Sequence, residues 1–188
     1  MAKSQIILIE LLEGTSGQGE TVVRGLERLS IVDKDTEPLV IFNVDTAYQE
    51  PVSFNIAELE HANGLLDVFI GDGESWSFVE PFNDNDQVGP VRRVVEKERI
   101  SSLCCTGMYW FKSLRTFQLA FDEYYDSNHS LFDGETYVAP IYQKMIEQNS
   151  NSVIYRQVER EKLDFFGTPS EYEDYVSKLG AVVGGFNA

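Results

Sequence analysis

A glycine-rich loop, Gly14-Thr15-Ser16-Gly17-Gln18-Gly19, precedes a segment in which apolar residues recur at helical spacing. Glycines let backbone N–H groups approach an anion at the start of a helix, so this loop has the composition of a phosphate or nucleotide contact. It lacks the Gly-Lys-Ser/Thr ending of a nucleoside-triphosphate loop. A plain turn, where glycine is common, explains the same residues, and the loop taken alone favours that interpretation.

Asp45 comes where the apolar run Leu39-Val40-Ile41-Phe42-Asn43-Val44 ends. In open α/β sheets, ligands bind beyond the carboxyl ends of strands. A carboxylate at that place can hold Mg²⁺ that is bound to substrate phosphates. A helix cap or an ordinary loop residue would occupy the same position, and position alone leaves the two interpretations equal.

Glu96 and Lys97 end another strand-like run, inside the charged segment 92–99. A carboxylate can accept hydrogen bonds from sugar hydroxyls and an ammonium group can hold a phosphate, so the pair suits a sugar phosphate. Charged runs are usually solvated, and spacing alone favours a solvated strand end. His61 and His129 have no metal-ligand spacing around them and suggest no catalytic arrangement.

Composition limits the class of protein. The chain has 188 residues, which predicts one domain, and 15 Lys and Arg against 31 Asp and Glu give a net charge of −16. That charge argues against nucleic acid or an anionic membrane as the main partner. No apolar stretch approaches the roughly 20 residues of a membrane span. The adjacent Cys104 and Cys105 are interpreted as reduced core thiols of a cytoplasmic protein.

Hydrophobic patterning predicts the elements that position these residues. The continuous apolar run 5–12 predicts a strand buried on both faces, and a helix follows it with Thr15 and Gln18 as a capping box. A second buried strand is expected at 38–45. Strand, helix and strand in this order predict a right-handed βαβ unit with parallel strands.

The rest of the chain predicts further strands and helices. Strands are expected at 66–70, 76–82, 88–96, 103–111 and 152–158, and helices from Leu114 and over 137–148. A last helix has Thr168 as its cap, Pro169 in its first turn and Glu171 completing a capping box. We expect one domain over residues 1–179 and a flexible tail over 180–188.

Seven segments together resemble the sugar-1-phosphate nucleotidyltransferase family, also called NDP-sugar pyrophosphorylases, and they occur in the family's order. They are 14–22, 39–46, 76–79, 95–101, 106–111, 134–140 and 166–172. The resemblance covers nearly the whole chain and is nearest the bacterial branch that serves capsule and lipopolysaccharide precursors. It implies an α/β fold with a mixed, mostly parallel, Rossmann-like sheet flanked by helices.

The resemblance also implies a reaction and its residues. A sugar phosphate would attack the α-phosphorus of a nucleoside triphosphate and release pyrophosphate, with Mg²⁺ as cofactor. The loop with Gly17 and Gln18 would face the nucleotide base, and Asp45 would be a metal ligand and catalytic residue. At the sugar, the resemblance implies contacts from Ser77, Glu96, Gly107 and Tyr109, while Lys97 would hold the sugar phosphate and act in catalysis.

Two departures from the family pattern bear on function. Members open with a Gly-x-Gly segment that ends in a basic residue, and this sequence has none, so we expect an N-terminally incomplete fold with an exposed sheet edge that favours self-association. The family's second metal-binding Asp corresponds to Phe165 here. Asp164 lies one residue earlier and would serve only if its strand is bulged.

These departures leave alternatives open. The chain can be a nucleotidyltransferase, a non-catalytic module that binds a nucleotide sugar or sugar phosphate, or a truncated inactive fragment. We expect the isolated chain to be inactive or very slow, because charge stabilisation on the triphosphate supplies much of the rate. The sequence names neither the base nor the sugar.

Overall fold

The computed structural model describes residues 6–29, 36–83, 86–126 and 134–184. A six-stranded sheet has the order β1-β6-β3-β7-β5-β4, and a separate pair joins β2 to β8. The strands are β1 (Leu39–Phe42), β2 (Thr46–Tyr48), β3 (Gly64–Ile70), β4 (Ser77–Pro81), β5 (Val88–Glu96), β6 (Leu103–Phe111), β7 (Val153–Gln157) and β8 (Leu163–Phe165).

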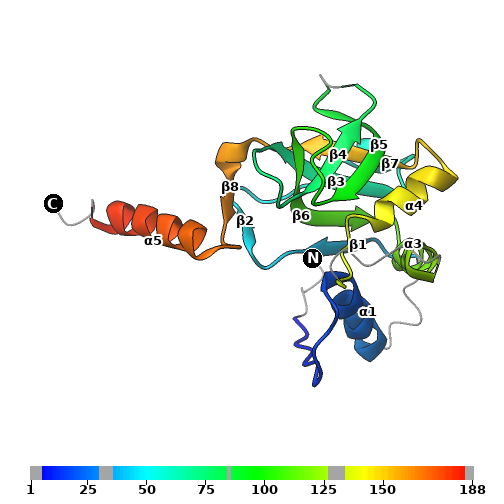
Figure 1. Cartoon of the computed structure of the whole chain (residues 1–188), viewed down its shortest axis with the longest axis horizontal. Coiled ribbons are helices and arrows are strands. Elements are labelled where there is room, and N and C mark those ends of the chain that lie inside the picture. The colour runs from blue at the N-terminus through cyan, green and yellow to red at the C-terminus, as the bar shows by residue number, and fades with distance from the viewer. Residues whose placement is uncertain (1–5, 30–35, 84–85, 127–133, 185–188) are drawn as a thin grey trace.

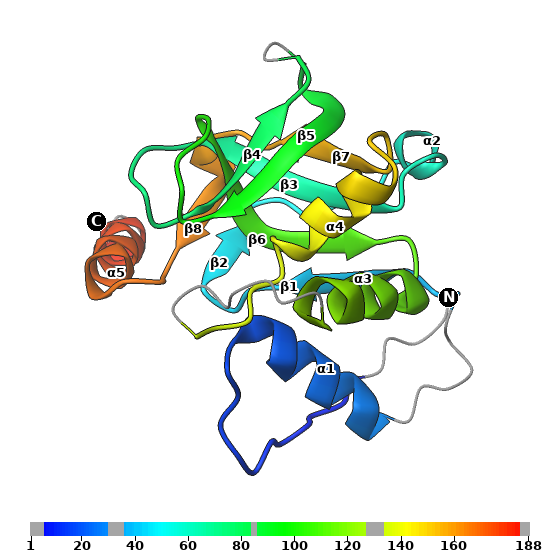
Figure 2. The ribbon, with the colours of Figure 1, turned by 45° about the vertical axis from the view of Figure 1, so that its right-hand side comes forward.

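Helices lie mainly along one side of the larger sheet. They are α1 (Gln18–Leu29), α2 (Ile56–Leu59), α3 (Leu114–Asp126), α4 (Ile141–Gln148) and α5 (Pro169–Gly184), with a 3-10 turn at Arg160–Lys162. Figures 1 and 2 show α3 and α4 packed beside each other against the sheet, α1 beyond β1, and α5 extending away from the body of the molecule. No helix within the described ranges has the length and apolar character needed to cross a membrane.

The larger sheet is mixed, and our expectation of a mostly parallel, Rossmann-like sheet is wrong. Among its described pairings, β3 with β7 is parallel, whereas β1–β6, β3–β6, β4–β5, β4–β6 and β5–β7 are antiparallel. Parallel neighbours need a long crossover connection, while antiparallel neighbours can be joined by a short turn. The short link between β4 and β5 therefore gives a hairpin.

The sheet closes partly on itself. Phe78 and Val79 of β4 pair with Cys104 and Leu103, at the beginning of β6, while the end of β6 pairs with β1. Strands β6, β3, β7, β5 and β4 therefore form a ring, which gives the sheet a barrel-like end. This closure brings the start of β4 and the end of β5 beside β6, where the polar candidates lie.

The N-terminal segment differs from the expectation. Residues 6–12 form no strand, and Ile6, Leu8 and Leu12 are 96%, 95% and 79% exposed. A strand needs neighbours for its N–H and C=O groups, and no described strand pairs with this segment. The predicted βαβ unit is therefore absent, and β1 instead pairs antiparallel with β6.

Helix α1 begins near the expected place but with a different cap. The backbone N–H and hydroxyl of Ser16 donate to Glu20, each at 2.5 Å. The predicted Thr15–Gln18 capping box is wrong, because Thr15 contacts Thr21 and Gln18 donates to Asn43 instead. The side chain of Gln18 is thereby turned from the helix cap toward β1.

Most other predicted elements are confirmed. Strands β3 to β7 and helix α3 lie where the patterns place them, and α5 has the expected capping box, with the Thr168 N–H donating to Glu171 at 2.9 Å. Helix α4 begins at Ile141 rather than at residue 137, because Pro140 lies at its N-terminal boundary. Helix α5 runs to Gly184, residues 185–188 lie outside the described residues, and the domain boundary at 179 stays a prediction.

Two aromatic clusters pack helices α3 and α4 and strand β8 against the larger sheet. Phe111 of β6 stacks on Tyr142 of α4 at 4.5 Å between ring centroids and meets Phe117 of α3 edge-on at 5.2 Å. On the other side, Phe165 of β8 lies 5.0 Å from Phe69 and 5.0 Å from Trp76. Burial of such rings is strongly stabilising, so β8 and its partner β2 are fixed against the main sheet.

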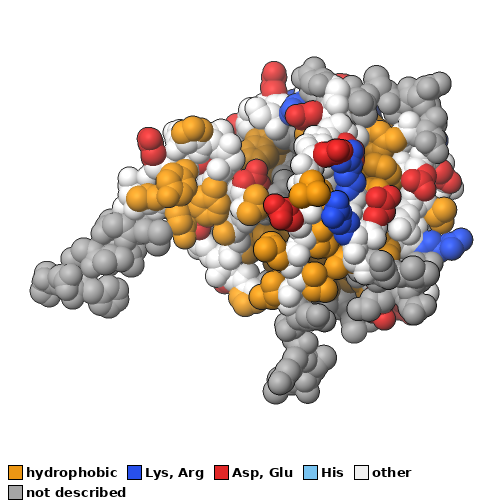
Figure 3. Space-filling model, turned by 90° about the horizontal axis from the view of Figure 1, so that it is seen from below, with side chains coloured by type: hydrophobic (Ala, Val, Ile, Leu, Met, Phe, Trp, Pro, Cys, Tyr) orange, Lys and Arg blue, Asp and Glu red, His pale blue; other side chains and the backbone are white. Residues whose placement is uncertain are grey.

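Strand β1 has one described partner, β6, and its other edge is unpaired within the described residues. Val40 and Phe42 on β1 are 43% and 48% exposed, and Val44 just after it is fully exposed. Figure 3 shows the underside of the molecule, where hydrophobic side chains lie among acidic and basic ones. An unpaired edge invites pairing with another strand, so self-association through this edge stays a prediction.

Candidate functional site

A pocket of about 560 Å³ lies where α1 begins, β1 ends and the closed end of the sheet meets β2 and β8. This volume is within the range of small-ligand sites. The predicted residues that line it are Gln18, Asp45, Ser77, Glu96, Lys97, Gly107 and Tyr109. Seven of the nine predicted site residues, drawn from distant parts of the chain, are therefore brought together.

Asp45 lies in the turn between β1 and β2. The Asp45 carbonyl accepts a 2.8 Å hydrogen bond from the Phe166 N–H, which ties this turn to the end of β8. A Cβ atom placed on Gly167 would lie 3.4 Å from Oδ2 of Asp45 and 3.6 Å from Oε2 of Glu171. Two carboxylates therefore flank Gly167 at one wall of the pocket, and Glu171 is the one that sequence reasoning treated only as a helix cap.

The donor set at this wall fits Mg²⁺, although no group of three or more described His, Cys, Asp or Glu residues is close enough to hold a metal ion by itself. Mg²⁺ is usually held by one or two carboxylates together with substrate phosphates. Asp45 would supply such a carboxylate, and Glu171 lies beside it. When bound, the ion would neutralise charge on phosphate oxygens.

The structure does not bring Asp164 to this wall. Its neighbours in β8, Leu163 and Phe165, are buried, while the Asp164 side chain faces Gln49 at 3.3 Å and Lys178 at 3.9 Å. Asp164 lines a separate small cavity beside α5. Its pairing with Ala47 is regular, so the bulge that would turn the carboxylate around is not present.

Gly17 also lies outside the set of pocket-lining residues, just behind Gln18. Its φ is +137°, and a Cβ atom there would lie 2.6 Å from the carbonyl oxygen of Thr136. The Thr136 N–H donates to Ser16 and its carbonyl accepts from Gly19. Gly17 therefore permits close packing of the loop against residue 136 and places Gln18 at the pocket rim.

Glu96 is buried, with 8% of its surface exposed, at the end of β5. Burial raises the pKa of its carboxyl group, while a hydrogen bond from Ser77 and the nearby charge of Lys97 oppose that rise. The solvated strand end that spacing favoured is therefore wrong for Glu96. Ser77 pairs with Glu96 across β4 and β5, so register places both side chains at the pocket.

Lys97 follows in a left-handed conformation with φ +50°, which is uncommon for a residue with a Cβ atom. Its ammonium donates a 2.6 Å hydrogen bond to the Tyr137 hydroxyl, and that hydroxyl donates to Glu135. The hydrogen bond to Tyr137 raises the pKa of Lys97, against partial burial. Lys97 is therefore a fixed cation at neutral pH.

Tyr137 lines the pocket and was missed by sequence reasoning, which assigned it to a helix. The signal for a non-helical Tyr137 was Pro140, since proline is tolerated only in the first turn of a helix and Tyr137 lies three residues before it. Asn43 was missed as well. It accepts from Gln18 and presses its side chain against Gly107.

Two further buried groups form the floor. Burial raises the pKa of the Cys105 thiol and of the Tyr109 hydroxyl well above their ordinary values. A protonated thiol is a poor nucleophile, so Cys105 fits a packing role. These two groups are therefore neutral, and the pocket's carboxyl groups and Lys97 supply its charge.

The chain is similar to solved structures of nucleotide-sugar pyrophosphorylases. A nucleoside-diphosphate-sugar pyrophosphorylase from Vibrio cholerae RC9 shares 34% identity with a TM-score of 0.77, over 89% of this chain and 67% of that one. A UDP-glucose pyrophosphorylase complexed with UDP-glucose shares 13% identity with a TM-score of 0.66, over 88% and 64% of the two chains. An apo UDP-glucose pyrophosphorylase shares 13% identity with a TM-score of 0.64, over 88% of this chain and 62% of that one.

The two UDP-glucose pyrophosphorylases are similar in fold alone at this identity, and the present chain spans less than two thirds of their length. No protein-family model matches the chain, and the search of curated proteins found no match.

Proposed function

The chain belongs to the nucleoside-diphosphate-sugar pyrophosphorylase family, and we propose that its pocket binds a sugar phosphate and the nucleotide that is joined to it. The proposed reaction is nucleotidyl transfer from a nucleoside triphosphate to a sugar phosphate, with pyrophosphate leaving. The observation that carries this proposal is the convergence of Asp45, Glu96 and Lys97 on one pocket.

In this proposal each group has a separate task. Glu96 accepts hydrogen bonds from sugar hydroxyls, and Lys97 holds the sugar phosphate. Asp45 binds Mg²⁺, which neutralises charge on the phosphates. Transfer between phosphates depends on such positioning and charge neutralisation more than on a protein base.

The nucleotide would lie toward α1. Gln18, Thr21 and Phe42 line the pocket on that side, while the residues proposed to bind the sugar phosphate belong to or follow β4 and β5. We expect Gln18 to lie near the base, although its amide already donates to Asn43. A cytoplasmic location and a place in capsule or lipopolysaccharide precursor synthesis belong to the same proposal.

A non-catalytic binding module is the second candidate. Lys97 is the one Lys or Arg that lines the pocket in the described part of the chain. A triphosphate carries several negative charges, and loss of a charge-stabilising donor costs about 10²–10³ in rate. This scarcity of cations favours binding over fast transfer.

Two measurements separate the candidates. Pyrophosphate release is followed with Mg²⁺, each nucleoside triphosphate and a set of sugar 1-phosphates, and nucleotide-sugar binding is measured by calorimetry. Turnover near 1 s⁻¹, the low end of typical enzyme rates, indicates an enzyme. Binding without turnover indicates a module, and neither binding nor turnover contradicts the proposed function.

A further inference from the structure

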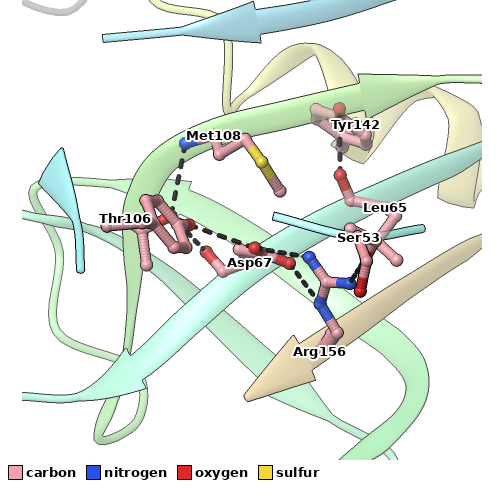
Figure 4. A network of polar contacts seen from close by, with 8 residues as sticks. Ser53, Leu65, Asp67, Thr106, Met108, Tyr142 and Arg156 are labelled. Atoms are coloured by element: carbon pink, nitrogen blue, oxygen red, sulfur yellow. Dashed lines mark hydrogen bonds and ion pairs between the residues drawn. The ribbon is translucent and has the colours of Figure 1, made fainter. Parts of the chain in front are cut away.

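A polar network joins β3, β6 and β7 beside the pocket (Figure 4), and Thr106 belongs to both. Asp67 of β3 is fully buried, and Arg156 of β7 binds it in a bidentate manner, with Nε at 2.9 Å from Oδ1 and Nη2 at 2.7 Å from Oδ2. Arg156 also donates to the Ser53 carbonyl at 2.6 Å. Because removing one partner of a buried pair leaves the other charge uncompensated, this pair is a rigid anchor.

Two hydroxyl groups connect the anchor to β6. The Tyr48 hydroxyl donates to Asp67 at 3.0 Å and lies 2.7 Å from Oγ1 of Thr106. The Met108 N–H donates to the same Thr106 oxygen at 3.3 Å. Each hydroxyl has one hydrogen. Tyr48 donates to the Asp67 carboxylate, while Thr106, which accepts from Met108, donates to the Asp67 carbonyl or to the Tyr48 oxygen. Such chains strengthen when they end on a charge.

The chain of hydroxyls supports a bulge in β6. Leu66 pairs with Tyr109 and Val68 pairs with Cys105, so three residues, 106–108, lie opposite Asp67 alone. Gly107, at the centre, has φ +90° and faces the pocket. Bulges redirect side chains and leave backbone groups without ladder partners. Here the Thr106 hydroxyl accepts from the Met108 N–H and lies 3.2 Å from the Asp67 carbonyl.

The same network supports the turn that carries Asp45. Tyr48 ends β2, three residues after Asp45, and β2 has its ladder partner in β8. The Tyr48 hydroxyl connects the end of this short strand to Asp67 and Thr106 in the main sheet, and its ring also contacts Phe42 of β1. The network therefore touches both walls of the pocket, the Gly107 bulge and the Asp45 turn.

We propose that Tyr48 and Thr106 are positioning residues, whose hydroxyl groups hold the β6 bulge and the β2 turn in the arrangement that the pocket requires. The inference rests on the proposed function only in the choice of the ligand that the pocket binds. Thr106 also lines the pocket, but its hydroxyl and that of Tyr48 are engaged in hydrogen bonds within the network.

Amide hydrogen exchange in the free protein tests this directly. In Tyr48→Phe, we expect the amides of Met108 and Asn43 to exchange about 10-fold faster, the effect of losing one well-placed hydrogen bond. Asn43 reports on the bulge because its N–H donates to the Gly107 carbonyl. Thr106→Val should have the same effect, and Thr106→Ser, which keeps the hydroxyl, should restore slow exchange.

Tyr155→Phe is the matched control. The Tyr155 hydroxyl donates its one hydrogen at the β4–β5 turn, where the Asp86 carbonyl lies at 2.8 Å and the Asn83 carbonyl at 3.2 Å. This variant should leave Met108 and Asn43 unchanged. The proposal is overturned if Tyr48→Phe leaves these amides unchanged. It is also overturned if exchange rises equally at the Tyr142 amide of α4, because that result indicates a general loss of stability.

A second measurement uses UDP-glucose with Mg²⁺ as the probe. Tyr48→Phe should weaken its binding about 5- to 10-fold, whereas Tyr155→Phe should not. If the unmodified chain binds no UDP-glucose, either the choice of a uracil nucleotide or the proposed function is wrong. The hydrogen-exchange result still tests the positioning inference in that case. Equal affinities of a binding-competent wild type and Tyr48→Phe would overturn the inference.

Discussion

The side chain of Asn43 lies directly against the backbone of Gly107. The Asn43 N–H donates a 3.0 Å hydrogen bond to the Gly107 carbonyl, and a Cβ atom on Gly107 would lie 2.7 Å from Nδ2 of Asn43. This contact joins the end of β1 to the bulge of β6. Because Asn43 also accepts from Gln18, one glycine determines how three elements meet at the pocket.

Replacing Gly107 should therefore cost both stability and ligand binding. In Gly107→Ala the added methyl group meets Asn43 and the residue keeps φ near +90°, so we expect a loss of about 2–4 kcal/mol in the free energy of unfolding. Urea denaturation measures it. Gly73→Ala is the control, since Gly73 has φ +89° but open space around it, and about 1 kcal/mol is expected there. Equal losses in the two variants would contradict the contact.

Sequence patterns predicted the central strand β6 because this strand is almost entirely apolar. All nine residues of β6 are buried, and the run 103–111 has no polar interruption except Thr106. The same rule failed for residues 6–12, which are equally apolar. An apolar run indicates that a segment can be buried, but it does not indicate whether a partner strand lies beside that segment.

The sequence predicted pocket residues on or next to β1, β4, β5 and β6, and missed residues that later segments of the chain bring to the pocket. Asp45, Glu96 and Lys97 come at the ends of predicted strands, but their positions alone did not predict a common site; the resemblance to the family did. Tyr137 reaches the pocket from a loop and Glu171 from the first turn of α5, and the path of both segments depends on packing. The one-residue offset of Asp164 was readable from sequence, and the regular pairing of β8 confirms that it faces away.

Lys97 should dominate the affinity for a sugar phosphate. Lys97→Ala removes the pocket's single lining cation among the described residues and should weaken glucose 1-phosphate binding by about 1.5–3 kcal/mol, the range for hydrogen bonds to charged groups. Calorimetry measures the change. Lys144→Ala, which removes a lysine paired with Glu147 on α4, should bind as the wild type does. Unchanged affinity in Lys97→Ala would return this residue to an ordinary strand end.

Asp45 should carry the Mg²⁺ dependence of nucleotide-sugar binding. Asp45→Asn should leave affinity in the absence of metal unchanged and remove most of the increase that Mg²⁺ produces, because Mg²⁺ prefers carboxylate oxygens. Asp164→Asn is the control, since that carboxylate lines the separate cavity beside α5. If Asp164→Asn lost the Mg²⁺ response and Asp45→Asn kept it, the assignment of the metal wall would be reversed.

Glu96 should make the stability of the fold fall as the pH rises. Burial raises the pKa of its carboxyl group above the ordinary value of 4.5, so the folded chain holds a proton that the unfolded chain releases. The free energy of unfolding therefore decreases as the pH increases from about 4.5 through the raised pKa, and this favourable contribution is complete only below 4.5. Glu96→Gln removes the titrating group and keeps an acceptor for the Ser77 hydroxyl. It should be more stable than the wild type by on the order of 1 kcal/mol at neutral pH, with little difference at pH 4.

Melting temperatures between pH 4 and pH 8 measure this difference, with Glu98→Gln as the control. Glu98 lies two residues away and its side chain is 62% exposed, so its replacement should not raise the stability at neutral pH. Glu96→Gln should also bind glucose 1-phosphate more weakly, because a neutral amide is a poorer acceptor for sugar hydroxyls than a carboxylate. Stability and binding then change in opposite directions, which is the pattern of a buried charge kept for a ligand. A variant that lost both would indicate that Glu96 serves the fold alone.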